Sequence, residues 1–396
     1  MLRLAVRMLV GDTIKWMGVV LGVFLCTFLI THMLSLFNGM LARTYATISD
    51  IPQADLWVMD PATEYVDEAP GLPPTALDRV RSVQGVQWAV PLITSGLRAR
   101  LPSGQFRPVT VIGVDDGTLI GLPELRALDA SLLRGQDAVI VDVNAAKDLL
   151  RMPVALPVRA PGWNTPDFTV PTRPLEVGDE FLINDHRAVV VGMVDLGPRF
   201  ISRAIVYAPY SRAVEMTPAQ RNLLTFILVK AAPGHSREAL AAHIQAQTGL
   251  RARTAEQFSQ DTKDYFVRVT GVVARIAFMV GIGVLVGACV SGLLLFLFTA
   301  ESARSYATFK ALGASGGTIV GMVVVQALVS GVVGYCLGTG ASCLLGTFIT
   351  SRAMPYRLTF STMVFTAVTV LAVSIFAAIL SSIKVLRLEP ARVFTN

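Results

Sequence analysis

Four long apolar stretches constrain this chain more than any other feature. A helix needs about 20 apolar residues to cross the hydrocarbon core of a bilayer, and such stretches occur at residues 16–37, 276–300, 319–350 and 362–383. The third is longer than one span requires and is rich in glycine, so we expect one helix with a tilted or broken outer end. The sequence therefore predicts a membrane α-helical protein with four transmembrane helices.

The composition supports a membrane location. Hydrophobic residues make up 53% of the chain and charged residues only 16%, whereas soluble domains usually carry about 25% charged residues. The first apolar stretch is too long for the core of a cleaved signal peptide, so we expect it to be retained. The net charge is +6, but there is no basic run with interleaved aromatic residues, and we expect no nucleic-acid partner.

The positive charges predict the orientation of the spans. Lys and Arg gather in short segments beside the apolar stretches, and the positive-inside rule places such segments in the cytoplasm. They are residues 1–15, expected to form an interfacial helix, residues 301–317, and the tail at residues 384–396. Both termini are then cytoplasmic, and residues 38–273 form one large domain on the outer side. A short outer loop at residues 351–361 holds two arginines, a mild exception to the rule.

Small residues spaced four apart occur in all four apolar stretches. This spacing puts them on one face of a helix, where they let two backbones approach closely. They are Gly18 and Gly22; Gly283, Gly287 and Ser291; Ser330, Gly334 and Gly338; and Ser374, Ala378 and Ser382. We therefore predict tight helix packing at these residues. His32 lies near the outer end of the first stretch, and its role stays open, because an ionisable residue in a span is a functional candidate by default.

The large outer segment reads as a mixed α/β domain. Runs rich in Val and Ile, bounded by Gly, Pro and Asp, indicate strands at residues 88–92, 109–114, 138–141, 188–194, 204–207 and 224–229. Helices are predicted at residues 75–83, 144–150 and 236–248, with Ser236 as the N-cap of the last. Residues 152–174 contain six prolines and should form a surface loop, either a contact arm or an irregular connection.

Residue patterns typical of catalytic or metal sites do not occur in the outer segment. His186, His235 and His243 lack a nucleophile motif and the HExxH spacing, and the adjacent Asp115 and Asp116 are expected to form a turn. The cysteines, Cys26, Cys289, Cys336 and Cys343, all lie in apolar stretches, where we expect them to fill space between helices. The chain is therefore not predicted to be an enzyme, nor to bind a metal or cofactor.

Residues 301–315 form the most informative cytoplasmic segment. Ala303, Tyr306 and Phe309 recur at helical spacing, and Gly313 can end a helix as its C′ residue. The run from Glu301 to Ser315 resembles the loop that follows the second span in ABC transporter permeases of the FtsX and MacB type, which ends in Ala-Leu-Gly-Ala-Ser. The tail from Leu388 to Phe394 is similar to that family's closing segment, and the layout of one span, a large outer domain and three further spans is the family's plan.

Within this family the chain looks most like the DevC branch, the permeases of DevBCA-type exporters. The similarity lies in the outer segment from Val111 to Asp116, in Leu122-Pro123-Glu124, and in the cytoplasmic run from Tyr306 to Gly313.

The resemblance implies a permease that works by mechanotransmission in the inner membrane. It implies a homodimer with a separate ABC ATPase subunit, and the chain has no GxxxxGK[ST] loop for ATP, so ATP and Mg²⁺ would be bound by that partner. A periplasmic membrane-fusion adaptor and a TolC-like outer-membrane channel are the further implied partners. The residues implied in ATPase coupling are Glu301, Arg304, Tyr306, Thr308, Phe309, Lys310, Leu312 and Gly313.

The function predicted from this resemblance is an ATP-driven exporter of a lipid, glycolipid or other amphiphile through a tripartite system. Two alternatives within the family are a lipoprotein-release permease and an FtsX-like regulator that activates a periplasmic hydrolase without transport. A membrane enzyme or sensor is a fourth hypothesis, and the missing catalytic pattern counts against it. The size of the outer segment favours the exporter over the regulator.

Overall fold

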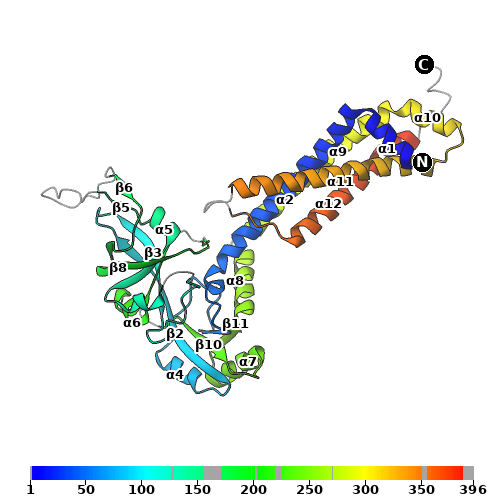
Figure 1. Cartoon of the computed structure of the whole chain (residues 1–396). Helices are drawn as coiled ribbons and strands as arrows, with labels where there is room; N and C mark the ends of the chain where they lie inside the picture. The colour runs from blue at the N-terminus through cyan, green and yellow to red at the C-terminus, as the bar shows by residue number, and fades with distance from the viewer. Residues whose placement is uncertain are drawn as a thin grey trace. The chain divides into compact units, whose positions relative to one another are not determined.

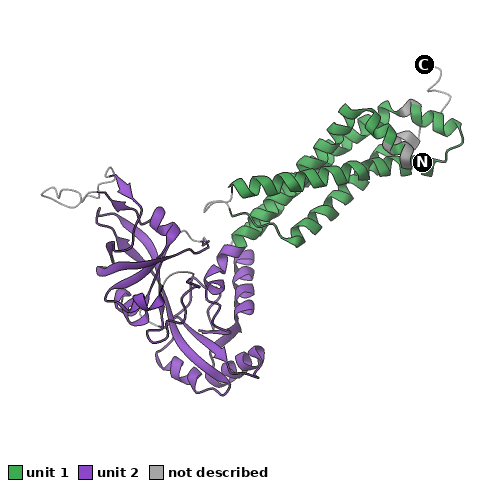
Figure 2. Ribbon diagram, viewed as in Figure 1, with its two compact units in different colours: residues 1–41, 270–396 green, residues 42–269 purple. Residues whose placement is uncertain are grey.

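The computed structural model describes residues 2–125, 129–154, 171–197, 199–200, 203–218, 224–269, 271–349 and 355–386. The chain divides into two compact units (Figure 2). The helical unit comprises residues 1–41 and 270–396, and the α/β unit comprises residues 42–269. The expected outer domain, residues 38–273, matches the α/β unit to within four residues at each end.

Six described helices build the helical unit (Figure 1). They are α1 (Leu2–Gly11), α2 (Thr13–Thr44), α9 (Val272–Glu301), α10 (Ala303–Ala311), α11 (Gly316–Ile349) and α12 (Phe360–Leu386). Among the described residues, α2, α9, α11 and α12 are long and apolar enough to cross a membrane. The prediction of four apolar helices is therefore confirmed.

Two boundary predictions need correction. The first long helix continues to Thr44, well beyond residue 37, because the residues that follow include good helix formers and no proline. The third stretch is one unbroken helix from Gly316 to Ile349, so a broken outer end was wrong. Glycine is tolerated there because a helix satisfies its own backbone hydrogen bonds, which is the only solution available in lipid.

Cysteine packing also differs from the prediction. Cys26 is buried inside the helical unit and packs where predicted, between helices. Cys289, Cys336 and Cys343 are exposed, so they face away from the packed interior of this chain and do not fill space within it.

One mixed sheet organises the α/β unit. Its strands are β1 (Leu56–Met59), β2 (Val86–Arg100), β3 (Phe106–Val114), β4 (Ala138–Asp142), β7 (Glu180–Ile183), β8 (His186–Val194), β9 (Ala204–Pro209), β10 (Phe226–Ala231) and β11 (Arg251–Thr254). Their order is β11-β1-β10-β2-β3-β9-β4-β8-β7. The pairs β3–β9 and β4–β8 are parallel, and the others are antiparallel. The mixed α/β class is therefore confirmed.

The long strand β2 joins two groups of strands in this sheet (Figure 1). Its first part, up to Leu92, pairs with β10, and its second part, from Ile93, pairs with β3. Near its end, Ala99 pairs with Ile183 of β7. This last pairing closes β2, β3, β9, β4, β8 and β7 into a ring, which leaves no free edge among these six strands.

Successive residues along a strand point to opposite faces of the sheet, and they lie in different hydrophobic cores of this unit. Val109 and Val111 of β3 lie in one hydrophobic core together with Val206 of β9, while Ile112 and Ile205, which point to the other face, lie in a second. This is the two-residue period of a strand. The second core also holds Trp57, whose ring meets the edge of Phe226 at a centroid distance of 5.3 Å.

Short helices cover the sheet. They are α3 (Ala46–Ser49), α4 (Thr75–Arg81), the 3₁₀ helix η1 (Ala130–Arg134), α5 (Val143–Lys147), α6 (Tyr210–Met216), α7 (Arg237–Thr248) and α8 (Ala255–Val269). Ser236 caps α7 as predicted, because its hydroxyl accepts a hydrogen bond from the backbone N–H of Ala239. The six predicted strands and three predicted helices are all confirmed in place, although α5 is shorter than predicted and ends at Lys147.

The proline-rich segment is described only at its ends. There β5 (Met152–Pro153) pairs antiparallel with β6 (Thr172–Arg173). Arg173 also forms a two-pronged ion pair with Asp179, at 2.6 and 2.7 Å, and these hydrogen bonds lower the pKa of Asp179. Residues 155–170, on which the prediction of a surface loop chiefly falls, lie outside the described residues.

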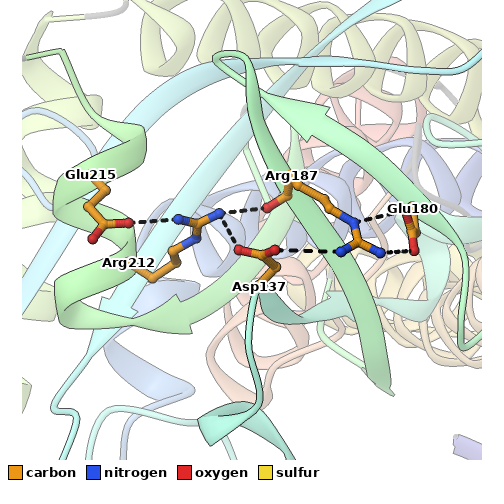
Figure 3. A network of polar contacts seen from close by, with 5 residues as sticks. All are labelled: Asp137, Glu180, Arg187, Arg212 and Glu215. Carbon is orange, nitrogen blue, oxygen red and sulfur yellow. Dashed lines mark hydrogen bonds and ion pairs between the residues drawn. The ribbon is translucent and has the colours of Figure 1, made fainter.

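A network of ion pairs ties α6 to the strands β7 and β8 (Figure 3). Arg212 of α6 contacts Asp137 at 2.5 Å and Glu215 at 2.7 Å, and Arg187 of β8 pairs with Glu180 of β7. Arg187 also approaches Asp137 at 3.8 Å. The pair between Arg187 and Glu180 is about half exposed and contributes little to stability, whereas Arg212 and Asp137 are largely buried.

Candidate functional site

Helix α10 is the connection between the long helices α9 and α11. It ends in a Schellman motif: the backbone N–H of Ala314 donates to the carbonyl of Phe309, and that of Gly313 donates to Lys310. Gly313 has a φ of +92°, a conformation that glycine adopts without a steric penalty. The predicted role of Gly313 as the residue that ends this helix is confirmed.

Tyr306 of α10 is buried within the helical unit. Its side chain is 1% exposed, and its hydroxyl donates to Oε1 of Gln326 in α11 at 2.9 Å. Nε2 of Gln326 donates in turn to the carbonyl of Ala5 in α1 at 3.2 Å. Burial raises the pKa of Tyr306 to about 12, so the hydroxyl stays protonated. This chain of hydrogen bonds holds α1, α10 and α11 together.

Tyr306 packs inside this chain, and its implied part in ATPase coupling stays a prediction. A side chain with 1% exposure presents no surface to another protein. Gln326 is fully buried and was not singled out in the sequence, although a lone amide within a long apolar stretch is the kind of residue that joins helices by hydrogen bonds. The aromatic hydroxyl and this amide were the signals that could have predicted the contact.

The other predicted coupling residues divide into buried and exposed groups. Phe309 is half-buried and packs against the same core as Tyr306, and Lys310 is also partly buried. Thr308 is exposed, and Leu312, just beyond the end of the helix, is 79% exposed. The side chain of Arg304 lies outside the described part of the chain. Among the side chains that the structure describes in residues 301–315, Leu312 is the large apolar one that is exposed.

Glu301 lies at the end of α9 and forms an ion pair with Lys15 at the start of α2. Lys15 also pairs with Asp12, at 2.6 Å. All three side chains are at least two-fifths exposed, so the pairs are worth little to stability. The pair between Lys15 and Glu301 joins the start of α2 to the end of α9, and α9 directly precedes α10 in the chain.

The predicted packing residues lie where α2 crosses its neighbours. A Cβ added at Gly287 of α9 would lie 2.2 Å from Cβ of Cys26, and one added at Gly22 would lie 2.9 Å from the hydroxyl of Ser291. On α11, a Cβ at Gly334 would lie 2.7 Å from Cβ of Val23. Real Cβ atoms do not approach this closely, so the helices meet there through bare backbone.

The remaining packing residues differ in how closely they are approached. A Cβ at Gly338 would lie 2.8 Å from the backbone carbonyl oxygen of Phe24, which is again too close for a real side chain. At Gly18 and Gly283 the nearest atoms would be 3.7 and 3.4 Å away, belonging to Leu294 and Leu29. Those two positions have ordinary van der Waals space.

His32 lies inside the helical unit. Its ring stacks on Phe28 at a centroid distance of 5.4 Å and lies 5.6 Å from the ring of Tyr356. Nδ1 is 3.4 Å from the hydroxyl of Ser342, which also contacts the hydroxyl of Tyr356 at 3.0 Å. These contacts account for the burial of an imidazole among apolar helices.

The two adjacent aspartates singled out in the α/β unit have structural partners. Asp115 accepts hydrogen bonds from the backbone and the hydroxyl of Thr118 at 2.8 and 2.7 Å, which confirms the predicted turn. Asp116 accepts from the backbone of Ser211. Within the described ranges, no group of three or more His, Cys, Asp or Glu side chains could hold a metal ion.

Comparisons with known proteins match most of the chain. A family model described as the MacB-like periplasmic core domain matches residues 17–247, and one described as the FtsX-like permease C-terminal matches residues 277–390. Among curated proteins no relative matches. The first match ends before the junction between α8 and α9, and the second match begins after it.

Similar solved structures include three domains from bacterial proteins. The extracellular domain of the noncanonic ABC-type transporter YknZ from Gram-positive bacteria is 14% identical, with a TM-score of 0.31, covering 51% of this chain and 99% of that one. The periplasmic region of MacB from Actinobacillus actinomycetemcomitans is 13% identical, with a TM-score of 0.34, covering 54% and 94%. A domain of a permease protein from Porphyromonas gingivalis is 15% identical, with a TM-score of 0.30, covering 52% and 90%.

Proposed function

The chain belongs to the FtsX/MacB-like family of ABC transporter permeases, and we propose that it is the permease subunit of an ATP-driven exporter. In this family ATP is hydrolysed by a separate ATPase, and the permease is a membrane protein with a large domain outside the cytoplasm. We further propose that the chain contacts an ABC ATPase and that force passes from the ATPase to the outer domain. The proposed substrate is a lipid, glycolipid or other amphiphile.

The observation that carries the proposal is the way α10 is anchored. Tyr306 and Gln326 tie α10 to α11 and α1, while Leu312 presents an apolar side chain to the surroundings. A short helix that is fixed to its own bundle, with a large exposed apolar side chain at its end, suits the transfer of force from a bound partner. A loosely held helix would move without displacing α1 and α11.

One of the two connections between the units is a continuous helix, and the other joins two helices through a short segment. Helix α2 runs without a break from Thr13 to Thr44, and α8 ends at Val269, shortly before α9 begins at Val272. Close backbone contact at Gly287 and Gly338 couples α2 to α9 and α11. We propose that ATPase closure displaces α10, that the bundle moves with it, and that α2 and α9 carry the motion to the outer domain.

The proposed assembly is the one that the resemblance to the family implies. It contains a second copy of the permease, an ABC ATPase, a periplasmic membrane-fusion adaptor and a TolC-like outer-membrane channel, with the permease in the inner membrane and both termini in the cytoplasm. The likeness to the DevC branch supports the exporter over a lipoprotein-release permease or a regulator. This branch assignment stays a prediction.

Topology mapping tests the proposed orientation. A reporter active only outside the cytoplasm should be active when fused after residue 130, and a cytoplasmic reporter should be active after residues 308 and 392, because Lys and Arg gather beside the latter two positions. Each fusion should be made with both reporters, so that a low signal is matched by a high one. A cytoplasmic signal at residue 130 contradicts the whole arrangement.

Copurification tests the exporter proposal itself. A tagged chain, purified in mild detergent from membranes of its own host, should bring with it an ABC ATPase and vanadate-sensitive ATP hydrolysis, and crosslinking should add an adaptor protein. A tagged, unrelated protein with four spans serves as the control for contamination. A permease that purifies intact but alone, in detergent and in crosslinked membranes, argues against the proposed function.

A further inference from the structure

A polar cavity of about 50 Å³ lies in the α/β unit. It is on the face of β3 opposite to the hydrophobic core that holds Val109 and Val111. Its floor is formed by β2, β3 and β9, where Thr94 pairs with Ile112 and Gly96 pairs with Thr110. Residues two apart on a strand share one face, so the hydroxyls of Thr94 and Thr110 are on the same side. Its walls include the arginines Arg199 and Arg203 and the carboxylate of Asp67.

Arg199 is a nearly buried cation in the lining of this cavity. Its side chain is only 9% exposed, and one end of the guanidinium pairs with Asp50 at 2.5 Å. The buried hydroxyl of Tyr207 lies beside this guanidinium, so Arg199 contributes chiefly its positive charge to the cavity.

Gly96 leaves the room in which the second arginine lies. A Cβ at residue 96 would be 2.6 Å from Nη1 of Arg203, so any other residue here would displace the guanidinium. Gly96 does not have a positive φ, so its backbone conformation does not require glycine. The missing side chain matters because it leaves space for Arg203. Two guanidinium groups thus line one small cavity beside two threonine hydroxyls.

We propose that this cavity binds a compact oxyanion, a carboxylate or a phosphate. Arg203 supplies charged donors, which bind such groups strongly through paired N–H bonds, Arg199 adds a second positive charge, and Thr94 and Thr110 supply hydroxyls. Asp67 is the one carboxylate among the described lining residues, and its negative charge disfavours a more highly charged anion. The oxyanion can come from a free solute or from the head group of an amphiphile, and this inference does not depend on transport.

Titration calorimetry of the full-length chain in a neutral detergent tests this site. The probes are inorganic phosphate and hexyl phosphate, at constant ionic strength. Both should bind the parent protein, and Arg203→Gln should weaken binding about tenfold or more, as expected for the loss of one charged hydrogen-bond donor. Gly96→Ala should weaken binding by displacing Arg203, and Asp67→Asn should strengthen it by removing a like charge.

The matched control is Arg98→Gln, which removes the same charge at an exposed residue of β2 that does not line the cavity. It should bind phosphate as the parent does, and every variant should keep the parental melting temperature. Tighter binding of hexyl phosphate than of phosphate identifies an amphiphile head group, and equal binding identifies a free anion. Absence of binding by both probes, or equal loss in Arg203→Gln and Arg98→Gln, overturns the proposal.

Discussion

Replacing Gly338 by valine should disrupt the helical bundle. A Cβ at this position would lie 2.7 Å from Cβ of Thr27 and 2.8 Å from the backbone carbonyl oxygen of Phe24. Backbone atoms cannot rotate away as a flexible side chain can, so α2 and α11 would have to separate. Overpacking a close contact typically costs up to about 3 kcal/mol, and we expect the valine variant to reach or exceed that figure.

The measurement is the fraction of monodisperse protein that survives heating in detergent. Gly340→Val is the matched control, because it adds the same side chain to the same helix at a position with no neighbouring atom within 4 Å. The control should melt as the parent does, while Gly338→Val should melt at a much lower temperature or fail to accumulate. Equal melting of the two variants would show that α2 and α11 do not meet at Gly338.

The helical unit shows which part of such packing a sequence can predict. Spacing by four predicted the packing face of each helix, because that face follows from helical geometry alone. It did not predict which helix would cross which: Gly287 meets Cys26 of α2, and Gly338 meets Phe24 of the same helix. Partner choice depends on the arrangement of the whole bundle, which no local pattern encodes.

Tyr306 illustrates a second limit. Helical spacing correctly grouped it with Phe309, but an apolar helix face can pack against its own chain or against a partner, and the spacing is the same in both cases. The structure places Tyr306 against Gln326, 20 residues further along the chain. The residue that decides the orientation of α10 thus lies in another helix.

In the α/β unit, strands with strong alternation were predictable and short ones were not. β3 and β8 are rich in Val and were predicted, whereas β11 carries two arginines in four residues and gave no signal. It is a strand because β1 supplies its hydrogen-bond partners. The cavity was equally hidden, since Gly96 and Arg199 meet only after β2 and β9 have joined the same sheet.

Replacing Leu312 by glutamate should release the proposed ATPase without harming the permease. Leu312 is 79% exposed, so a charge there costs the isolated chain little. At an interface a large apolar anchor is typically worth about 2 kcal/mol or more, which corresponds to a loss of affinity of about thirtyfold. A buried unpaired carboxylate would add to that loss.

Two controls separate this effect from damage to the fold. Val177→Glu adds the same charge at an exposed valine of the α/β unit and should leave the ATPase bound. Tyr306→Phe removes the hydroxyl that serves Gln326, so it should lower the melting temperature of the helical unit while the contact surface at Leu312 remains. A buried polar group left without its partner typically costs about 1–3 kcal/mol.

The most direct test of the account is the vanadate-sensitive ATP hydrolysis that copurifies with each mole of permease. We expect the parent and Val177→Glu to carry equal activity, and Leu312→Glu to lose most of it while its melting temperature stays that of the parent. Full ATP hydrolysis bound to an intact Leu312→Glu permease would contradict the proposal that α10 is the site through which an ATPase drives this protein.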